Sequence, residues 1–225
     1  MPEPTPFRGL RKVIASRMLA SLQSTAQLTY HCQLDVSSIV ALLPEWKAQG
    51  HQHGLQDCLL FALARALVRH PVLNGTCDAD GYTLASTIDI NLALAAPTGL
   101  VTPVLRHVET LTLAELAAAR RDLTGRAAQN GLAVSEMKAG TFTFSNLGLS
   151  PVEYFTPIIN APQIAILGVG KLIRRPMLDK DGGLIEQALV PLSLTADHRV
   201  VDGDPAGRFL TDLAAALRDT DWREV

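Results

Sequence analysis

The stretch DHRVVDG, residues 197–203, decides the interpretation of this 225-residue chain. It follows a strand-like run, VPLSLT at residues 190–195, and precedes a helix-like segment over residues 205–219. Junctions between a strand and a helix are where rigid scaffolds present reactive side chains. A neutral histidine can accept a proton from a thiol or a hydroxyl near pH 7. His198 is therefore the candidate general base, and Asp202 is the candidate carboxylate that orients or charge-balances it.

The composition excludes several classes of protein. A formal net charge of −2 gives no electrostatic footprint for nucleic acid or for an anionic membrane, and 5% aromatic residues offer no stacking platform for bases. No apolar run approaches the roughly 18 residues that span a bilayer, and no secretory signal is visible. Cys32, Cys58 and Cys77 form no metal-ligand pattern, so we expect no metal and a cytoplasmic location.

The periodicity of apolar residues predicts a single mixed α/β domain. Perfect alternation over residues 28–36 indicates a half-buried strand, most simply an antiparallel one. Thr112 and Glu115 form a capping box that opens a helix. Helices are expected at residues 10–22, 37–50, 57–68, 112–129 and 205–219, and strands at residues 28–36, 88–94, 100–105, 141–144, 163–169 and 189–195.

Five blocks in order resemble the catalytic domain of the dihydrolipoamide acyltransferases, the core enzymes of 2-oxoacid dehydrogenase complexes. They are GLRKVIASRM (9–18), GLVTPVL (99–105), GTFTFSNLG (140–148), FTPIINAPQIAILG (155–168) and DHRVVDG (197–203). The resemblance implies the α/β fold of chloramphenicol acetyltransferase, a single-domain, two-layer sandwich with a mixed β-sheet. Residues 1–6 would be a linker remnant and residues 7–225 the acyltransferase domain, with no lipoyl or peripheral-subunit-binding domain present.

The same resemblance implies roles for individual side chains. His198 would remove the proton of a thiol, and Ser145 of a neighbouring subunit in a homotrimer would hydrogen-bond the oxyanion. Asp202 would form a structural ion pair with Arg11 or Arg17. Without the resemblance, each residue has a structural interpretation. His198 would be a structural histidine, Ser145 a residue that favours a turn, and Asp202 the N-cap of a helix.

Coenzyme A and a lipoyl group carried on another domain or chain would be the substrates, entering a channel from opposite ends. Its expected walls include Asn146, Thr98, Gly99 and Leu100, although the loop at residues 95–98 is shorter than in the family and lacks its aspartate. The expected partners are a lipoyl domain and the 2-oxoacid dehydrogenase and dihydrolipoamide dehydrogenase subunits. Residues 221–225 are charged, so the sequence does not decide whether trimers assemble further into a cubic core.

The expected reaction is acyl transfer between dihydrolipoyl groups and coenzyme A, as in pyruvate dehydrogenase complexes. Acetyl is the first choice because SNLG at residues 145–148 resembles the acetyl and branched-chain members. Two alternatives stay open. One is a catalytically silent scaffold of such a complex, and the other is a coenzyme A-dependent O-acyltransferase acting on a small molecule.

Overall fold

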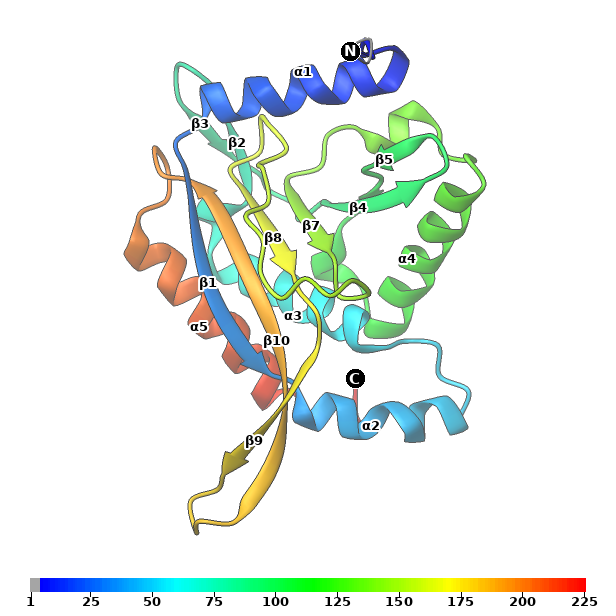
Figure 1. The fold of residues 1–225 in the computed structure, drawn as a ribbon, viewed down its shortest axis with the longest axis vertical. Helices are drawn as coiled ribbons and strands as arrows, with labels where there is room; N and C mark the ends of the chain where they lie inside the picture. Colours follow the sequence, from blue (N-terminus) through cyan, green and yellow to red (C-terminus); the bar gives the residue numbers. More distant parts are fainter. Residues whose placement is uncertain (1–4) are drawn as a thin grey trace.

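A mixed β-sheet forms the centre of the computed structural model, which describes residues 5–225 (Figure 1). The linker predicted at residues 1–6 therefore lies largely outside the described residues. The strands are β1 (Gln27–Asp35), β2 (Gly75–Cys77), β3 (Tyr82–Leu84), β4 (Ile90–Ala96), β5 (Gly99–Val101), β6 (Val104–Leu105), β7 (Phe142–Asn146), β8 (Ala165–Val169), β9 (Ile173–Leu178) and β10 (Leu184–Asp197). The eight-stranded sheet has the order β1-β10-β8-β7-β4-β5, with β6 paired to β4 and β9 to β10.

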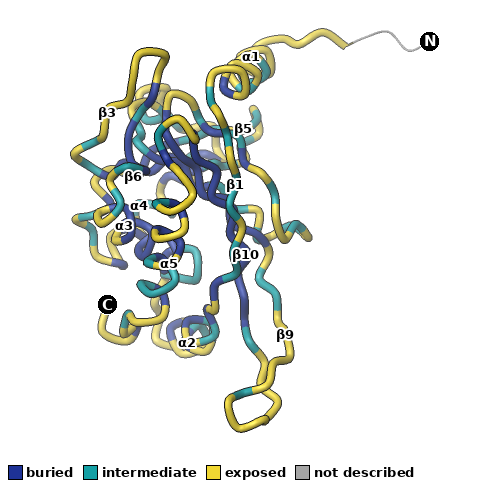
Figure 2. The backbone as a smooth tube through the Cα atoms, turned by 90° about the vertical axis from the view of Figure 1, so that its left-hand side faces the viewer, coloured by how far each residue is buried: buried dark blue, intermediate teal, exposed yellow. Residues whose placement is uncertain are grey.

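Helices cover one face of this sheet, which gives the expected two layers (Figure 2). The α-helices are α1 (Gly9–Ser24), α2 (Ser37–Ala48), α3 (Leu55–Arg69), α4 (Leu113–Ala128) and α5 (Gly203–Asp219), of which α2 to α5 cover that face. Phe142 and Phe144 of β7 and Phe209 of α5 are fully buried in the core between the layers. The helix α1 instead lies across one end of the sheet (Figure 1). Among residues 5–225, no helix combines the length and the apolar character that crossing a membrane requires.

The strand predicted from alternation is confirmed as antiparallel. Strand β1 pairs with β10 along its whole length, from Gln27 opposite Asp197 to Asp35 opposite Leu189. Thr29 and Thr195 share a side-chain hydrogen bond of 2.8 Å, so the polar residues of both strands lie on one face. The pairing extends to Asp197, the last residue of β10, and His198 lies in the turn between this strand and α5.

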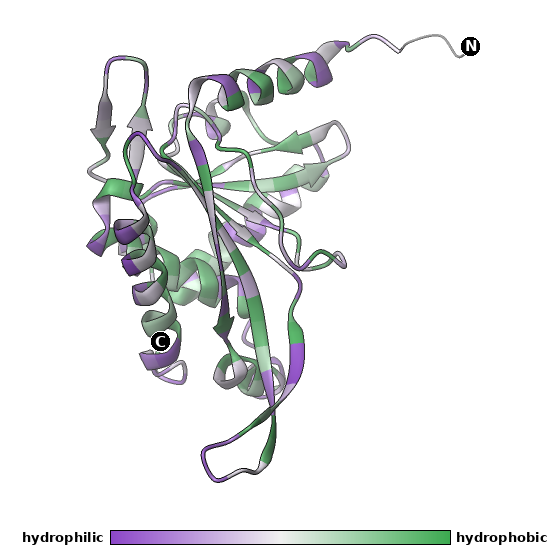
Figure 3. Cartoon of the chain, turned by 60° about the vertical axis from the view of Figure 1, so that its left-hand side comes forward, coloured by the Kyte–Doolittle hydropathy of each residue, from purple (hydrophilic) through white to green (hydrophobic). Residues whose placement is uncertain are grey.

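Two hairpins were not predicted. One joins β2 and β3, and the other joins β9 to the first half of β10 and projects from the body of the molecule (Figures 1 and 3). The tip of the second hairpin exposes Met177, Leu178, Leu184 and Ile185. Strand β10 is accordingly 14 residues long and begins at Leu184 rather than at residue 189.

Gly170 marks a close approach of two backbones beside the sheet. A Cβ atom placed there would lie 1.8 Å from the carbonyl oxygen of Glu153, and a backbone atom cannot move aside as a flexible side chain can. We expect Gly170→Ala to lower the free energy of unfolding by roughly 1–3 kcal/mol in a urea titration. Gly125→Ala in α4 is the control, because a Cβ there meets nothing within 4 Å and alanine favours the helix. Equal stability of the two variants would contradict the prediction.

Candidate active site

His198 lies in a tight turn whose backbone is fixed by hydrogen bonds. Its N–H donates to the carbonyl of Ala26 over 2.8 Å, which ties the turn to the start of β1. The N–H groups of Val200 and Val201 donate to the carbonyl of Asp197 over 2.9 and 3.0 Å. The His198 side chain is 42% exposed, so its ring is accessible from outside the chain. A rigid backbone under an accessible imidazole is suitable for a general base.

Asp202 is the nearest acid to this imidazole. Its Oδ1 lies 3.4 Å from Nδ1 of His198, while the carboxylate remains 79% exposed. A carboxylate beside Nδ1 favours the neutral tautomer that carries its proton there, which leaves Nε2 free to accept one. The predicted orienting role of Asp202 thus has its geometry within one chain.

Among residues 5–225 of one chain, Asp202 contacts His198, and its predicted ion pair with Arg11 or Arg17 stays a prediction. Helix α1 is fixed elsewhere: Leu10 packs near Gly99 of β5, and Ser21 donates a hydrogen bond to the carbonyl of Ile159. This placement leaves both arginines exposed.

A buried ion pair that the sequence analysis missed stabilises the His198 turn. Asp197 is fully buried, and its carboxylate accepts from Nη2 of Arg199 over 2.6 Å and from the N–H of Ala26 over 3.2 Å. Arg199 also donates to the carbonyl of Asp78 and to Sγ of Cys77, at the β2–β3 hairpin. Burial opposes the ionisation of Asp197, but the hydrogen bonds outweigh burial and hold the pKa of its carboxyl below the ordinary value.

Ser145 lies on β7, far from His198 of the same chain. The register places Ser145 beside Gly168 of β8, and Gly168 beside Ser193 of β10. His198 follows Ser193 by five residues, so two strand spacings and five residue rises separate the two side chains by on the order of 20 Å. No hydrogen-bonded reaction intermediate spans that distance. One chain alone therefore does not bring the predicted base and oxyanion donor together.

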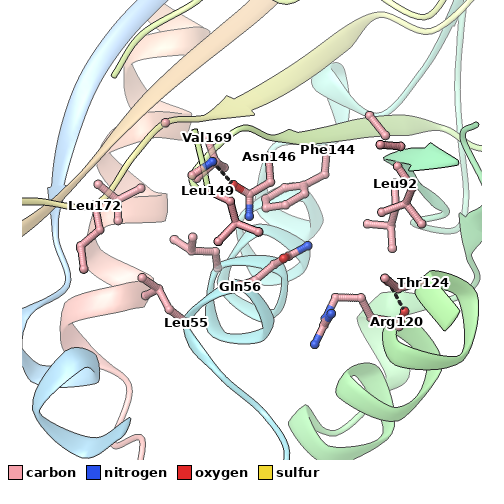
Figure 4. Close-up of a pocket in the computed structure, with 17 residues that line it drawn as sticks. Leu55, Gln56, Leu92, Arg120, Thr124, Phe144, Asn146, Leu149, Val169 and Leu172 are labelled. Atoms are coloured by element: carbon pink, nitrogen blue, oxygen red, sulfur yellow. Dashed lines mark hydrogen bonds between the residues drawn. The ribbon is translucent and has the colours of Figure 1, made fainter. Parts of the chain in front are cut away.

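A cavity of about 400 Å³ lies between the sheet and the helices α3 and α4 (Figure 4). Its lining includes Asn146, the residue that follows Ser145 in the sequence, but not Ser145 itself. Asn146 of β7, Gln56 of α3 and Arg120 of α4 contribute polar groups to it. Its remaining lining is largely apolar and includes Leu55, Leu59, Leu92, Leu94, Phe144, Leu149, Val169, Leu172 and Val190. An apolar cleft with a few polar groups is the usual form of a small-molecule site.

The predicted channel residues separate in the structure. Asn146 lines the cavity, and its Oδ1 accepts the N–H of Gly148 over 2.7 Å. Thr98, Gly99 and Leu100 are not among the described residues that line it, because they form the turn between β4 and β5 near α1. Their assignment to a substrate channel stays a prediction.

The carboxylate of Asp57 holds Arg120 in the cavity wall. Asp57 is the first residue of the helix predicted at residues 57–68. Asp57 is 1% exposed and accepts from Nε of Arg120 over 2.5 Å and from the N–H of Gly54 over 2.9 Å. The helix begins at Leu55, two residues earlier than predicted. Asp57 therefore both caps α3 and joins it to α4.

The cysteine thiols are poorly suited to nucleophilic chemistry. Burial raises the pKa of Cys32 to about 11 and that of Cys58 to about 12, so both thiols remain protonated near pH 7. In the part of the chain that the structure describes, no group of three or more His, Cys, Asp or Glu side chains is arranged to hold a metal ion.

Residues 2–222 match the family model described as 2-oxoacid dehydrogenases acyltransferase (catalytic domain). The chain is 35% identical over 219 residues to the dihydrolipoyllysine-residue acetyltransferase component of the acetoin cleaving system of Bacillus subtilis, covering 95% of this chain and 55% of that protein. It is 34% identical to the succinyltransferase component of the Escherichia coli 2-oxoglutarate dehydrogenase complex, covering 95% of this chain and 54% of that protein. The chain thus spans about half the length of these relatives.

Solved structures agree with this similarity. The dihydrolipoamide acetyltransferase of Azotobacter vinelandii superposes with a TM-score of 0.88 at 31% identity, over 97% of this chain and 92% of that one. That structure belongs to an investigation of a serine, a histidine and an asparagine in its catalytic mechanism, the asparagine following the histidine by four residues. A chloramphenicol acetyltransferase superposes with a TM-score of 0.59 at 19% identity, over 96% of this chain, which confirms the expected fold.

Proposed function

Because the chain belongs to the family of 2-oxoacid dehydrogenase acyltransferase catalytic domains, we propose that it transfers an acyl group between coenzyme A and a dihydrolipoyl group. The observation that carries this proposal is His198, an accessible imidazole on a hydrogen-bonded turn with Asp202 beside Nδ1. The spacing of these two residues equals that of the histidine and asparagine investigated in the A. vinelandii enzyme.

The proposed reaction exchanges one thioester for another. Nε2 of His198 removes the proton of the attacking thiol, and the thiolate adds to the carbonyl carbon of the acyl thioester. The resulting oxyanion accepts a hydrogen bond from Oγ of Ser145. Collapse of the tetrahedral intermediate breaks the original carbon–sulfur bond, and the leaving thiolate takes the proton back from His198.

Two copies of the chain are required for this reaction. His198 and Ser145 of one chain are on the order of 20 Å apart by the strand register. We therefore infer that each site combines His198 of one subunit with Ser145 of the next, in the homotrimer that the family resemblance implies.

The channel between subunits, where His198 of one chain meets Ser145 of the next, is the proposed binding site for coenzyme A. The lipoyl arm would then reach the thiol from the opposite side.

Acetyl is the proposed acyl group, following the likeness of residues 145–148 to acetyl-transferring members. The relatives include an acetyltransferase component and a succinyltransferase component, so the acyl group differs among them. We propose that a lipoyl domain and the 2-oxoacid dehydrogenase and dihydrolipoamide dehydrogenase subunits complete the complex.

The test is the transfer of acetyl from acetyl-CoA to free dihydrolipoamide, with succinyl-CoA compared in parallel. We expect turnover with acetyl-CoA and a smaller kcat/KM with succinyl-CoA. If neither acyl group is transferred, the proposal is wrong: coenzyme A binding in calorimetry would then indicate a different acceptor, and no binding would indicate a scaffold.

Ser145→Ala tests the oxyanion contact. We expect kcat to fall by roughly 10²–10³ with little change in the KM for acetyl-CoA, because the hydroxyl acts on charge that develops only in the transition state. Ser150→Ala is the control and should retain activity, since Oγ of Ser150 bonds only within its own turn, donating to the carbonyl of Leu147 and accepting from the N–H of Val152. A raised KM at unchanged kcat would instead assign Ser145 to substrate binding.

A further inference from the structure

The ring of Phe155 covers Gly168 on the surface of the sheet. A Cβ atom at Gly168 would lie 2.7 Å from Cζ of Phe155 and 3.1 and 3.2 Å from its two Cε atoms, and these are the three nearest heavy atoms. Phe155 belongs to the segment between β7 and β8 and is half-buried. Its ring therefore occupies the space that a side chain at residue 168 would fill.

Ser145 faces the same side of the sheet as this ring. Ser145 of β7 is the register partner of Gly168 of β8, and paired residues on neighbouring strands project to the same face. Phe144 and Asn146, on either side of Ser145 in the sequence, project to the opposite face and line the cavity under α3 and α4. The ring of Phe155 thus covers the position one strand spacing, about 4.8 Å, from Ser145.

The two neighbours of Ser145 across the sheet differ in bulk. Its register partner on β4 is Ala93, whose side chain is a single methyl group. Beyond Gly168 the same row continues to Ser193 and His31, which share a hydrogen bond of 2.9 Å. The space beside Ser145 is therefore closed toward β8 by an aromatic ring, whereas toward β4 this chain places only a methyl group.

The acyl substituent lies close to this ring in the proposed reaction. Because Oγ of Ser145 donates a hydrogen bond to the oxyanion, the carbonyl carbon lies within about 4 Å of that Oγ. The substituent is bonded directly to the carbonyl carbon. An acetyl methyl group fits between Ser145 and the ring, whereas a branched chain meets the ring.

We propose that Phe155 is a specificity-determining residue whose ring limits the transferred acyl group to a short, unbranched chain. This inference rests on the proposed function and names the class of acyl group that the site accepts. It separates acetyl from branched-chain acyl groups, which the sequence of residues 145–148 does not distinguish.

The test measures transfer to dihydrolipoamide from acetyl-CoA and from isobutyryl-CoA in the wild type, Phe155→Ala and Phe155→Leu. The ratio of the two kcat/KM values is compared, because a loss of activity common to both donors cancels in it. In Phe155→Ala we expect the isobutyryl-to-acetyl ratio to rise roughly 10- to 200-fold, the range for one methylene group in an apolar pocket. Phe155→Leu keeps more of the side-chain volume, so its ratio should rise less. Circular dichroism checks that both variants are folded.

Tyr154→Ala is the matched control. Tyr154 precedes Phe155 in the same segment, but its ring packs edge-on against His31, with 5.2 Å between the ring centroids. His31 lies on β1, so β10 and β8 separate it from Ser145 on β7. We expect the donor ratio of Tyr154→Ala to stay within twofold of the wild type.

The outcomes separate this inference from the proposed function. Acetyl transfer with an unchanged donor ratio in Phe155→Ala, or an equal rise in Tyr154→Ala, overturns the role of Phe155 and leaves acyl transfer standing. A wild type that prefers isobutyryl-CoA also contradicts the size limit alone. Absence of transfer from either donor, in the wild type and all variants, overturns both proposals.

Discussion

Replacing His198 with alanine is expected to lower kcat for acyl transfer by roughly 10²–10⁴, the usual contribution of a positioned general base. The substitution removes the imidazole, which is the group that accepts the thiol proton in the proposed reaction. Structure should be preserved, because the turn is held by backbone hydrogen bonds to Ala26 and Asp197 rather than by the imidazole. Activity measured with acetyl-CoA and dihydrolipoamide, together with the mass of the assembly, tests both statements.

His31 provides the matched control for this substitution. It is another accessible histidine, on β1, and its Nδ1 lies 2.9 Å from Oγ of Ser193. His31→Ala is expected to remain within a few-fold of wild-type activity, since no proposed step uses it. Retention of more than a tenth of wild-type kcat in His198→Ala would refute the base assignment.

Arg199→Met is expected to cause the largest loss of stability, lowering the free energy of unfolding at pH 7 by about 3 kcal/mol. The variant leaves the fully buried carboxylate of Asp197 without its cation and detaches the β2–β3 hairpin from the His198 turn. Urea unfolding measures the loss. Arg174→Met is the control, because the pair of Arg174 with Glu186 is more than half exposed on both sides and contributes little.

The loss should also depend on pH in a defined direction. In the wild type the folded-state pKa of Asp197 lies below its unfolded value, so this group stabilises the fold at neutral pH, and that contribution is lost as the pH falls through the folded-state pKa. Without Arg199 the buried carboxyl no longer gains from ionisation. The difference between wild type and variant should therefore be largest near pH 7 and shrink as the pH falls below the ordinary pKa of an aspartate. A pH-independent difference would show that lost packing, not the ion pair, is responsible.

Much of the fold follows from local sequence patterns. Thr112 and Glu115 form the expected capping box, with Oγ1 of Thr112 accepting from the N–H of Glu115 and the carboxylate accepting from the N–H of Thr112. The alternation in residues 28–36 correctly gave a half-buried antiparallel strand. These features depend on neighbours in the sequence, which is why they are predictable without a structure.

The missed features depend on distant partners. Strand β9 is largely exposed and exists by pairing with β10, so its residues carry little periodicity of their own. No role was predicted for Arg199, although it belongs to the DHRVVDG motif. Its contacts with Cys77 and Asp78 join segments 121 or more residues apart, which no local pattern indicates. The four-residue spacing of His198 and Asp202 indicated a carboxylate that orients the imidazole, whereas the ion pair with α1 came only from the family resemblance. That spacing was visible from the start.

The central claim is that acyl transfer takes place at a site shared by two copies of this chain. It is tested most directly by forming mixed assemblies of His198→Ala and Ser145→Ala, through co-expression or joint refolding, and measuring acetyl transfer. In random mixed trimers about a quarter of the sites should combine an intact His198 with an intact Ser145, so activity should rise to about that fraction of wild type. Mixed assemblies that remain as inactive as their parents would contradict the account, because they would place both residues of each site in a single chain.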